Sequence, residues 1–270
     1  MDSGIEEAES TRTRCGSTVR QLLVNTLQAK IVFLGLYMAE PFYTLLARDI
    51  EFGNKTAYQD IELQFKLIYD NTFDPETKLL KHGYFDPNAP ADVARPVWAD
   101  PTTGQCPHVW DRAVGWYMMA LADLLIGPDA IPPWTSAYWT LLKQYQQLVP
   151  ALVDNADPAT GAWWLILTAV GQPGNYLESS GTAMFVYSML RGITSGLIPD
   201  PKKTIRKAAI KAYEWLGNEM VIENADGTLS WNGTVNVGSL GSNGTFEYYI
   251  SRVRKAKRSC LLRLAHTLYL

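Results

Sequence analysis

Similar turn sequences recur along this chain, and three of the four follow a stretch with the apolar periodicity of a helix. The turns combine Asp with Pro, Thr or Gly, and they lie at 71–86, 98–110, 154–167 and 223–235. Asp side chains accept hydrogen bonds from nearby backbone N–H groups, and Pro and Gly favour the backbone angles of turns. The intervals from the first turn to the third and from the third to the fourth are each long enough for two helices and a loop. The pattern therefore predicts a repeated helical hairpin.

The segments between the turns have apolar residues three and four positions apart, which is the spacing of one helix face. These segments are 36–48, 58–69, 113–126, 134–152, 179–195 and 202–221. Alternating Val-rich segments, which are typical of strands, are nearly absent. We therefore predict an all-α fold in which helical hairpins form an α/α toroid, with the functional loops at one end. A solenoid-type helical repeat scaffold is the alternative.

The composition is that of a globular protein with a large core, because 47% of the 270 residues are hydrophobic and 19% are charged. This length suits one large domain or two ordinary ones. With a net charge of −3 and no basic cluster before the C-terminal tail, we expect no nucleic-acid partner. No apolar run has the length of a membrane span, so we expect no membrane partner. Segment 1–16 lacks the apolar core of a secretory signal. We expect a cytoplasmic protein by default, or a secreted one if the sequence is truncated at its N-terminus.

No motif for a metal or an organic cofactor is recognisable. The cysteines and histidines are too scattered to form a ligand set: Cys15, Cys106, Cys260, His82, His108 and His266. A nucleophile elbow, a phosphate-binding loop and a dinucleotide fingerprint are also missing. Nine Trp and fourteen Tyr suit the binding of sugar rings. What remains is acid–base chemistry on a sugar, which requires a positioned carboxyl group.

Arg112 stands at the start of a predicted buried helix, in the stretch CPHVWDRAVGWYMMALADLL. A buried arginine needs an anionic partner. If the helix begins near Asp111, where a carboxylate is favoured, Arg112 and Trp116 share one face. With Trp110 and Trp116 beside it, Arg112 would form a clamp for an anionic sugar, since a guanidinium binds a carboxylate through two hydrogen bonds. The alternative is a structural role, as a cation–π pair or as a salt bridge to a nearby Asp.

His82 follows a predicted helix within the turn KHGYFDP, where its side chain would face a cleft and contact a ligand hydroxyl or transfer a proton. The alternative is a loop histidine bonded to the backbone, and His108 is expected at the surface or in packing. Several carboxylates are candidates for the sugar chemistry, and each also has a structural alternative: Glu40, Asp86, Asp123 and Glu178. Glu178, for example, precedes a predicted helix whose N-terminus favours negative charge.

Six blocks occur in the order found in a known family: GLYMAEPFY, KHGYFD, WADPTTG, WDRAVGWYMMALADLL, GNYLESSGTAMFVYSMLRGI and GTVNVGSLGSNGTFEYYIS. Over residues 17–250 the chain resembles the unsaturated rhamnogalacturonyl hydrolases of glycoside hydrolase family 105, which are similar to the unsaturated glucuronyl hydrolases. The resemblance implies an (α/α)6 barrel that needs neither a metal nor an organic cofactor. It also implies a small anionic oligosaccharide as substrate, namely a 4,5-unsaturated galacturonic acid linked to rhamnose, as pectin lyases produce.

The resemblance implies a mechanism and a set of site residues as well. In the family an Asp protonates the C4=C5 double bond and then helps water to add at C5, and the resulting hemiketal opens and releases the sugar. The residues that contact the unsaturated sugar fall on Trp110, Arg112 and Trp116, and the active-site histidine falls on His82. By this resemblance, the substrate carboxylate would be the partner of Arg112.

The sequence departs from the family at the catalytic position. The family motif Trp-x-Asp-Gly-Leu-Tyr-Met contains the acid, whereas this chain has Leu34 in place of the Asp and Val32 in place of the Trp. Leucine cannot donate a proton, so we assign no catalytic acid, and enzyme activity is left open. The alternatives to a hydrolase are a catalytically inactive carbohydrate-binding relic and a structural helical scaffold. A further alternative is that Asp86 or Asp111 replaces the missing acid.

The two ends of the chain also differ from the family. Segment 1–16 is polar and unmatched where the family has helices that close the barrel, and segment 251–270 is basic and unmatched. We therefore expect residues 17–250 to form a partial six-hairpin domain that is incomplete at its N-terminus. Mispredicted exon boundaries are one hypothesis that accounts for the departures, and sequencing the transcript would test it.

Overall fold

All six predicted helices are present in the computed structural model, which describes residues 33–50, 54–252 and 257–258. The helices are α2 (Phe33–Asp49), α3 (Lys55–Thr72), α4 (Asp111–Leu125), α5 (Ser136–Asp154), α6 (Ser179–Thr194) and α7 (Thr204–Trp215). A short helix, α8 (Phe246–Ile250), and a 3-10 turn, η1 (Leu167–Ala169), lie in the loops. Segment 1–16 and most of the tail 251–270 lie outside the described residues.

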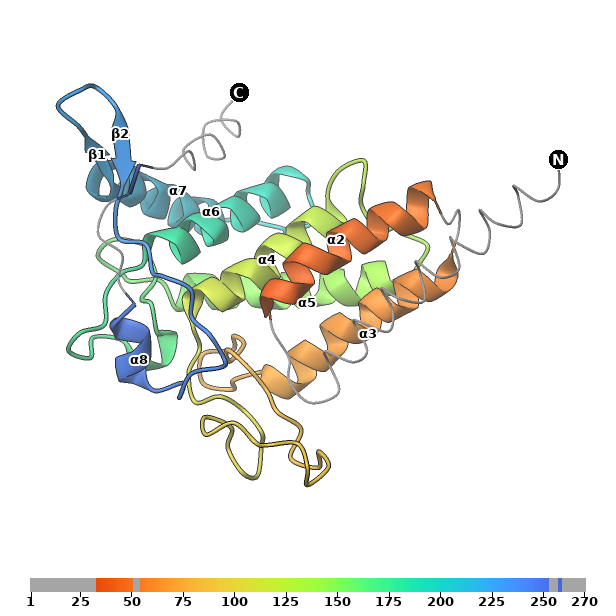
Figure 1. Ribbon diagram of the computed structural model, residues 1–270. Helices are drawn as coiled ribbons and strands as arrows, with labels where there is room; N and C mark the ends of the chain where they lie inside the picture. The colour runs from red at the N-terminus through yellow and green to blue at the C-terminus, as the bar shows by residue number, and fades with distance from the viewer. Residues whose placement is uncertain (1–32, 51–53, 253–256, 259–270) are drawn as a thin grey trace.

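The helices are arranged as hairpins in two layers (Figure 1). Helices α2, α4 and α6 run side by side in one layer, with α4 packed between the other two. Their hairpin partners α3, α5 and α7 form the second layer, where α5 contacts α3 and α7. Because α4 is covered by α2, α5 and α6, it is buried nearly all round rather than along one stripe. The predicted all-α toroid of helical hairpins is thus confirmed.

The turns at Asp74 and Asp157 share one geometry, as their sequences predict. Each Asp accepts hydrogen bonds at 2.7–2.9 Å from the backbone N–H and from the hydroxyl of the Thr three residues later. The residue four positions after each Asp has a left-handed φ, which is 58° at Lys78 and 77° at Gly161. Glycine adopts this angle without the steric cost that lysine incurs. The side-chain hydrogen bonds that both turns share therefore determine the turn conformation, and glycine only lowers the steric cost of the left-handed φ.

A small sheet is the part of the fold that the periodicity did not predict. Strand β1 (Val221–Glu223) pairs antiparallel with β2 (Leu229–Trp231), and β3 (Lys257–Arg258) pairs with the other edge of β2. The predicted helix 202–221 is wrong at its end, because α7 passes into a π-helical turn, η2 (Leu216–Met220), and a strand begins at the next residue. Strands of two or three residues are too short to show an alternating pattern. In the part of the chain that the structure describes, no helix is both long enough and apolar enough to cross a membrane.

Candidate active site

The amino ends of α2, α4 and α6 lie at the same end of the molecule as the long loops and α8 (Figure 1). Helix amino ends carry a positive partial charge, which suits an anionic ligand. Short extended segments hold two of these ends together. The N–H of Asp111 donates to the carbonyl of Leu165 at 3.0 Å, and that of Glu178 donates to the carbonyl of Trp163 at 2.9 Å. The first residues of α4 and α6 are therefore fixed side by side.

Arg112 has a carboxylate partner within the protein. Its Nη2 lies 3.2 Å from Oε1 of Glu178, whose side chain is fully buried. The same Nη2 donates to the carbonyl of Val235 at 2.8 Å, and Nε donates to the hydroxyl of Ser180 at 2.8 Å. This is the salt-bridge alternative considered from the sequence, with a Glu in place of the expected Asp. Pairing of Arg112 with a substrate carboxylate stays a prediction, because the internal partner does not test it.

One edge of the Arg112 guanidinium has no partner among the residues that the structure describes. Its Nη1 makes no hydrogen bond to any residue that the structure describes, and 13% of the side chain is exposed. Helix α4 also places Trp116 four residues later, on the same face as Arg112. The internal salt bridge fixes the guanidinium, and Nη1 can then donate to an anion without reorganisation.

Glu178 and Asp111 form a buried pair of carboxyl groups in which one proton is retained. Burial would raise the pKa of Glu178, but Arg112 and the backbone N–H groups of Gly181 and Val235 hold it below its usual value. Burial, and then the charge of Glu178, raise the pKa of Asp111 well above its usual value. Oδ2 of Asp111 has no donor within reach among the described residues. That atom gains a hydrogen bond when it carries the proton, because its O–H can then donate to the carboxylate of Glu178.

This carboxyl pair is structural, because both side chains are fully buried and neither is open to a ligand. Glu178 caps α6 by accepting from the N–H of Gly181 at 2.5 Å. Close packing depends on the absence of a side chain at Gly181, where an added Cβ would come within 2.3 Å of Oδ2 of Asp111. Asp111 is therefore held inside the protein by its pairing with Glu178 and its packing against Gly181, and its replacement of the missing acid stays a prediction.

Trp116 is the half-buried aromatic residue of the predicted set, and it faces α2. Its ring lies 5.0 Å from that of Tyr37, measured between centroids, with an angle of 33° between the planes. Tyr37 follows Leu34 by three residues in α2, so position 34 belongs to the same face of this helix. The side chain of Leu34 lies outside the described part of the chain, as does Val32. Trp116 thus connects α4, which carries Arg112, to the first turns of α2.

His82 and Trp110 lie together inside the protein, and each is only 4% exposed. The edge-on rings are 4.6 Å apart, and Nδ1 of His82 lies 2.5 Å from the hydroxyl of Tyr249 in α8. Gly238 covers the other part of the Trp110 ring, where an added Cβ would come within 2.8 Å of Cη2. Both predicted residues are therefore next to the site but inside the protein. His108 packs edge-on against Tyr249 at 5.9 Å, as the packing alternative predicted.

The remaining sequence candidates bond residues other than Arg112. Asp86 accepts from the N–H of Asn88 in an exposed turn. Asp123 is partly buried between the inner helices, where it accepts from the hydroxyl of Tyr187 at 2.8 Å and also bonds Tyr37. Cys106 is buried and free. No three metal-binding side chains cluster within residues 33–50, 54–252 and 257–258, and three residues lie outside them: Cys15, Cys260 and His266.

Glu40 is a buried acid in α2, with 1% of its surface exposed. Its Oε2 has no hydrogen-bond partner among the described residues. Burial, and then the charge of Asp60, raise the pKa of Glu40 to about 8. A carboxyl group in this environment favours its neutral form, so folding near pH 7 takes up a proton at Glu40.

We expect Glu40 to make the protein less stable as the pH rises. Its folded-state pKa of about 8 lies above the ordinary value of 4.5, so the folded state holds the proton more tightly. The stabilisation is complete at pH values below the ordinary pKa, and it is lost as the pH rises through the folded-state pKa. Urea unfolding would measure the free energy of unfolding of the wild-type chain and of Glu40→Gln, which cannot titrate at this position. The wild-type value minus the variant value should fall by roughly a few kcal/mol from about pH 5 to about pH 9. A difference that is the same at both pH values would contradict this expectation.

Helical hairpins in a toroid, with an arginine and aromatic side chains at the amino ends of the inner helices, define the class of the six-hairpin glycosidases. The sequence model of Glycosyl Hydrolase Family 88 matches residues 16–260. The chain therefore belongs to this family, which confirms the resemblance found in the sequence.

Known proteins support the assignment. A solved glycoside hydrolase from family 105 of C. acetobutylicum is similar with a TM-score of 0.74 and 34% identity, over 85% of this chain. The present chain spans only 61% of the length of that protein. Protein Atu3128 of Agrobacterium fabrum is 32% identical over 214 residues, which are 75% of this chain and 86% of the relative. Unsaturated glucuronyl hydrolase from Bacillus sp. GL1 has a TM-score of 0.54 at 15% identity, over 77% of this chain and 52% of that one, and it shows the fold alone.

Proposed function

We propose that this glycoside hydrolase scaffold acts on small unsaturated galacturonyl-rhamnose oligosaccharides, of the kind that pectin lyases release. The observation that carries the proposal is the arrangement of Arg112 and Trp116 on one face of α4, at the amino end of an inner helix. The free Nη1 of Arg112 would donate to the uronate carboxylate, and Trp116 would lie against the sugar ring. His82 would act indirectly: its ring would hold in place Trp110 and the loop that leads to α4.

The proposed chemistry is hydration of the C4=C5 double bond. A proton adds to C4, a water oxygen bonds to C5 and the water gives up its proton, and the resulting hemiketal opens with release of the neighbouring sugar. The residues described around Arg112 supply no free acid for the first step, because Asp111 and Glu178 are buried in their own pair. Protonation is therefore the step that Leu34 would impair. A carbohydrate-binding relic, which binds without turnover, is the second candidate, and the leucine at this position favours it.

Binding tests both candidates, because each predicts that the sugar occupies the site. We expect the wild-type chain to bind the unsaturated disaccharide in a calorimetric titration. Trp116→Ala should weaken that binding by about 2- to 10-fold, which is the loss of one aromatic contact worth about 0.5–1.5 kcal/mol. The matched control is Trp139→Ala, since Trp139 is 60% exposed on α5 in the outer layer. An intact fold with no binding would leave only the structural scaffold.

A further inference from the structure

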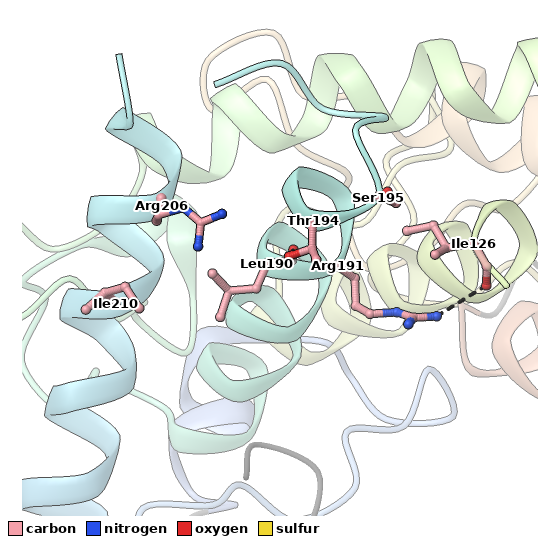
Figure 2. A pocket seen from close by; sticks show the side chains of 7 residues that line it. All are labelled: Ile126, Leu190, Arg191, Thr194, Ser195, Arg206 and Ile210. Atoms are coloured by element: carbon pink, nitrogen blue, oxygen red, sulfur yellow. Dashed lines mark hydrogen bonds between the residues drawn. The ribbon is translucent and has the colours of Figure 1, made fainter. Parts of the chain in front are cut away.

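A pocket lies between α6 and α7, close to the carboxyl end of α6 (Figure 2), whereas Arg112 is bonded at its amino end. Its volume is about 350 Å³, which is within the range of small-ligand sites. From Ser180, beside Arg112, to Arg191, in this pocket, the helix rises by roughly 16 Å. The pocket is therefore separate from the site proposed for the sugar.

The polar lining of this pocket is cationic. Arg191 comes from the last turn of α6 and Arg206 from the first turn of α7, and no Asp or Glu is among the lining residues. The guanidinium of Arg206 is turned toward α6 (Figure 2), and it makes no hydrogen bond or ion pair with any described residue. The first turn of a helix adds a positive partial charge to that of Arg206.

Arg191 adds a second positive charge to the pocket wall. Its guanidinium is turned toward Ile126 and away from Arg206 (Figure 2). Its Nη2 donates to the carbonyl of Ile126 at 3.2 Å, and its guanidinium carbon lies 6.0 Å from the centre of the Tyr187 ring. Arg191 therefore contributes charge to the pocket, and Arg206 contributes the accessible N–H groups.

The nearest carboxylates are committed elsewhere. Asp200 accepts from the backbone N–H groups of Ile205 and Arg206, at 3.2 and 2.9 Å, and so caps α7. Asp123 lowers the positive field at Arg191 but accepts from the hydroxyl of Tyr187 and does not line the pocket. The two lining hydroxyls, on Thr194 and Ser195, already donate to backbone carbonyls of α6. The free donors of the pocket are therefore arginine N–H groups alone, which select an oxyanion.

We propose that this pocket binds a small ligand through a carboxylate or phosphate group. Arg206 would bind the anion directly, and the positive charge of Arg191 would add to the attraction. Leu190 and Ile210 form apolar walls, which would contact the body of the ligand. The proposal does not depend on the function of the Arg112 site, and it adds a second anion site to the protein.

The test is titration of the full chain at constant ionic strength with inorganic phosphate, with galacturonate and with neutral galactose as the uncharged control. We expect saturable binding of at least one anion and none of galactose. Arg206→Gln should weaken that binding at least about 10-fold, because the main charge and its hydrogen bonds are lost. Lys207→Gln is the matched control, since it removes one exposed charge beside the pocket and should leave the binding unchanged. Binding of phosphate alone would indicate a phosphorylated ligand, and binding of galacturonate alone would indicate a carboxylate.

Two results would overturn the proposal. One is the absence of saturable binding for both anions. The other is an equal weakening by Arg206→Gln and Lys207→Gln, which would mean general charge attraction. Galacturonate binding that persists in Arg206→Gln would belong to the Arg112 site, so this variant also separates the two sites. Arg206 is exposed, so the variant should fold, and unfolding curves check this. Arg206→Lys provides a second variant, which keeps the charge but loses the paired N–H geometry and should bind more weakly than wild type.

Discussion

We expect Leu34→Asp to turn over the unsaturated galacturonyl-rhamnose disaccharide at least about 100-fold faster than the wild-type chain, because a positioned general acid contributes about 10²–10⁴-fold. Position 34 lies in the first turn of α2, three residues before Tyr37, which contacts Trp116. An Asp at this position would be on the helix face that leads to Arg112. The measurement is the fall in ultraviolet absorbance as the conjugated double bond of the substrate is consumed.

The control for this prediction is Leu34→Asn, which has nearly the same size and polarity as the Asp variant but cannot donate an acidic proton. It should be as slow as wild type. Rapid turnover by the wild-type chain would mean that another carboxyl group protonates the substrate and that Leu34 is no obstacle. If Leu34→Asp stays inactive although it binds the sugar, the incomplete barrel rather than the missing acid limits the reaction.

The helices could be predicted because their signals are local. The period of α4 is visible within fifteen residues, and the Asp–Thr hydrogen bonds of the turns at Asp74 and Asp157 join residues three positions apart. The small sheet could not be predicted, because β3 pairs with a strand more than twenty residues earlier and has no periodicity of its own. The family resemblance supplied the toroid that these local signals alone left open.

The site was predictable in its residue types but not in its pairing. Arg112 and Trp116 are four residues apart, so their shared face follows from helix geometry. The partner Glu178 lies 66 residues later, and sequence spacing gives no information at that distance. Its signal was the position before α6, which was interpreted as favouring the helix start; the structure shows that it also holds Arg112. Tyr249, which bonds His82 from α8, was inside a family block but had no local pattern to single it out.

The pairing of Arg112 with Glu178 predicts the largest effect on stability. We expect Glu178→Gln to lower the free energy of unfolding by about 3–5 kcal/mol, because it leaves the charge of Arg112 without its buried counter-ion. The amide N–H₂ would also have to replace an oxygen that now accepts from Gly181, so two donors would face each other. Urea unfolding at neutral pH measures the loss, and a change in midpoint without a change in m-value would show that stability alone is affected.

Asp111→Asn is the matched comparison for Glu178→Gln, since it alters the other member of the same buried pair. Burial and the charge of Glu178 keep Asp111 protonated, so a neutral amide changes little in charge. Its Oδ1 can still accept from the N–H of Arg112, and its N–H₂ can donate to Glu178. We therefore expect a loss below about 1 kcal/mol in the free energy of unfolding, since a hydrogen bond replaces a hydrogen bond.

The contribution of Glu178 to stability should depend on pH. Because its pKa is lowered in the fold, this contribution is present above the ordinary pKa of 4.5 and is lost as the pH falls through the folded-state pKa. The difference in the free energy of unfolding between Glu178→Gln and Asp111→Asn should therefore become smaller at acid pH. If the two variants lose the same stability at neutral pH, the proton does not reside on Asp111.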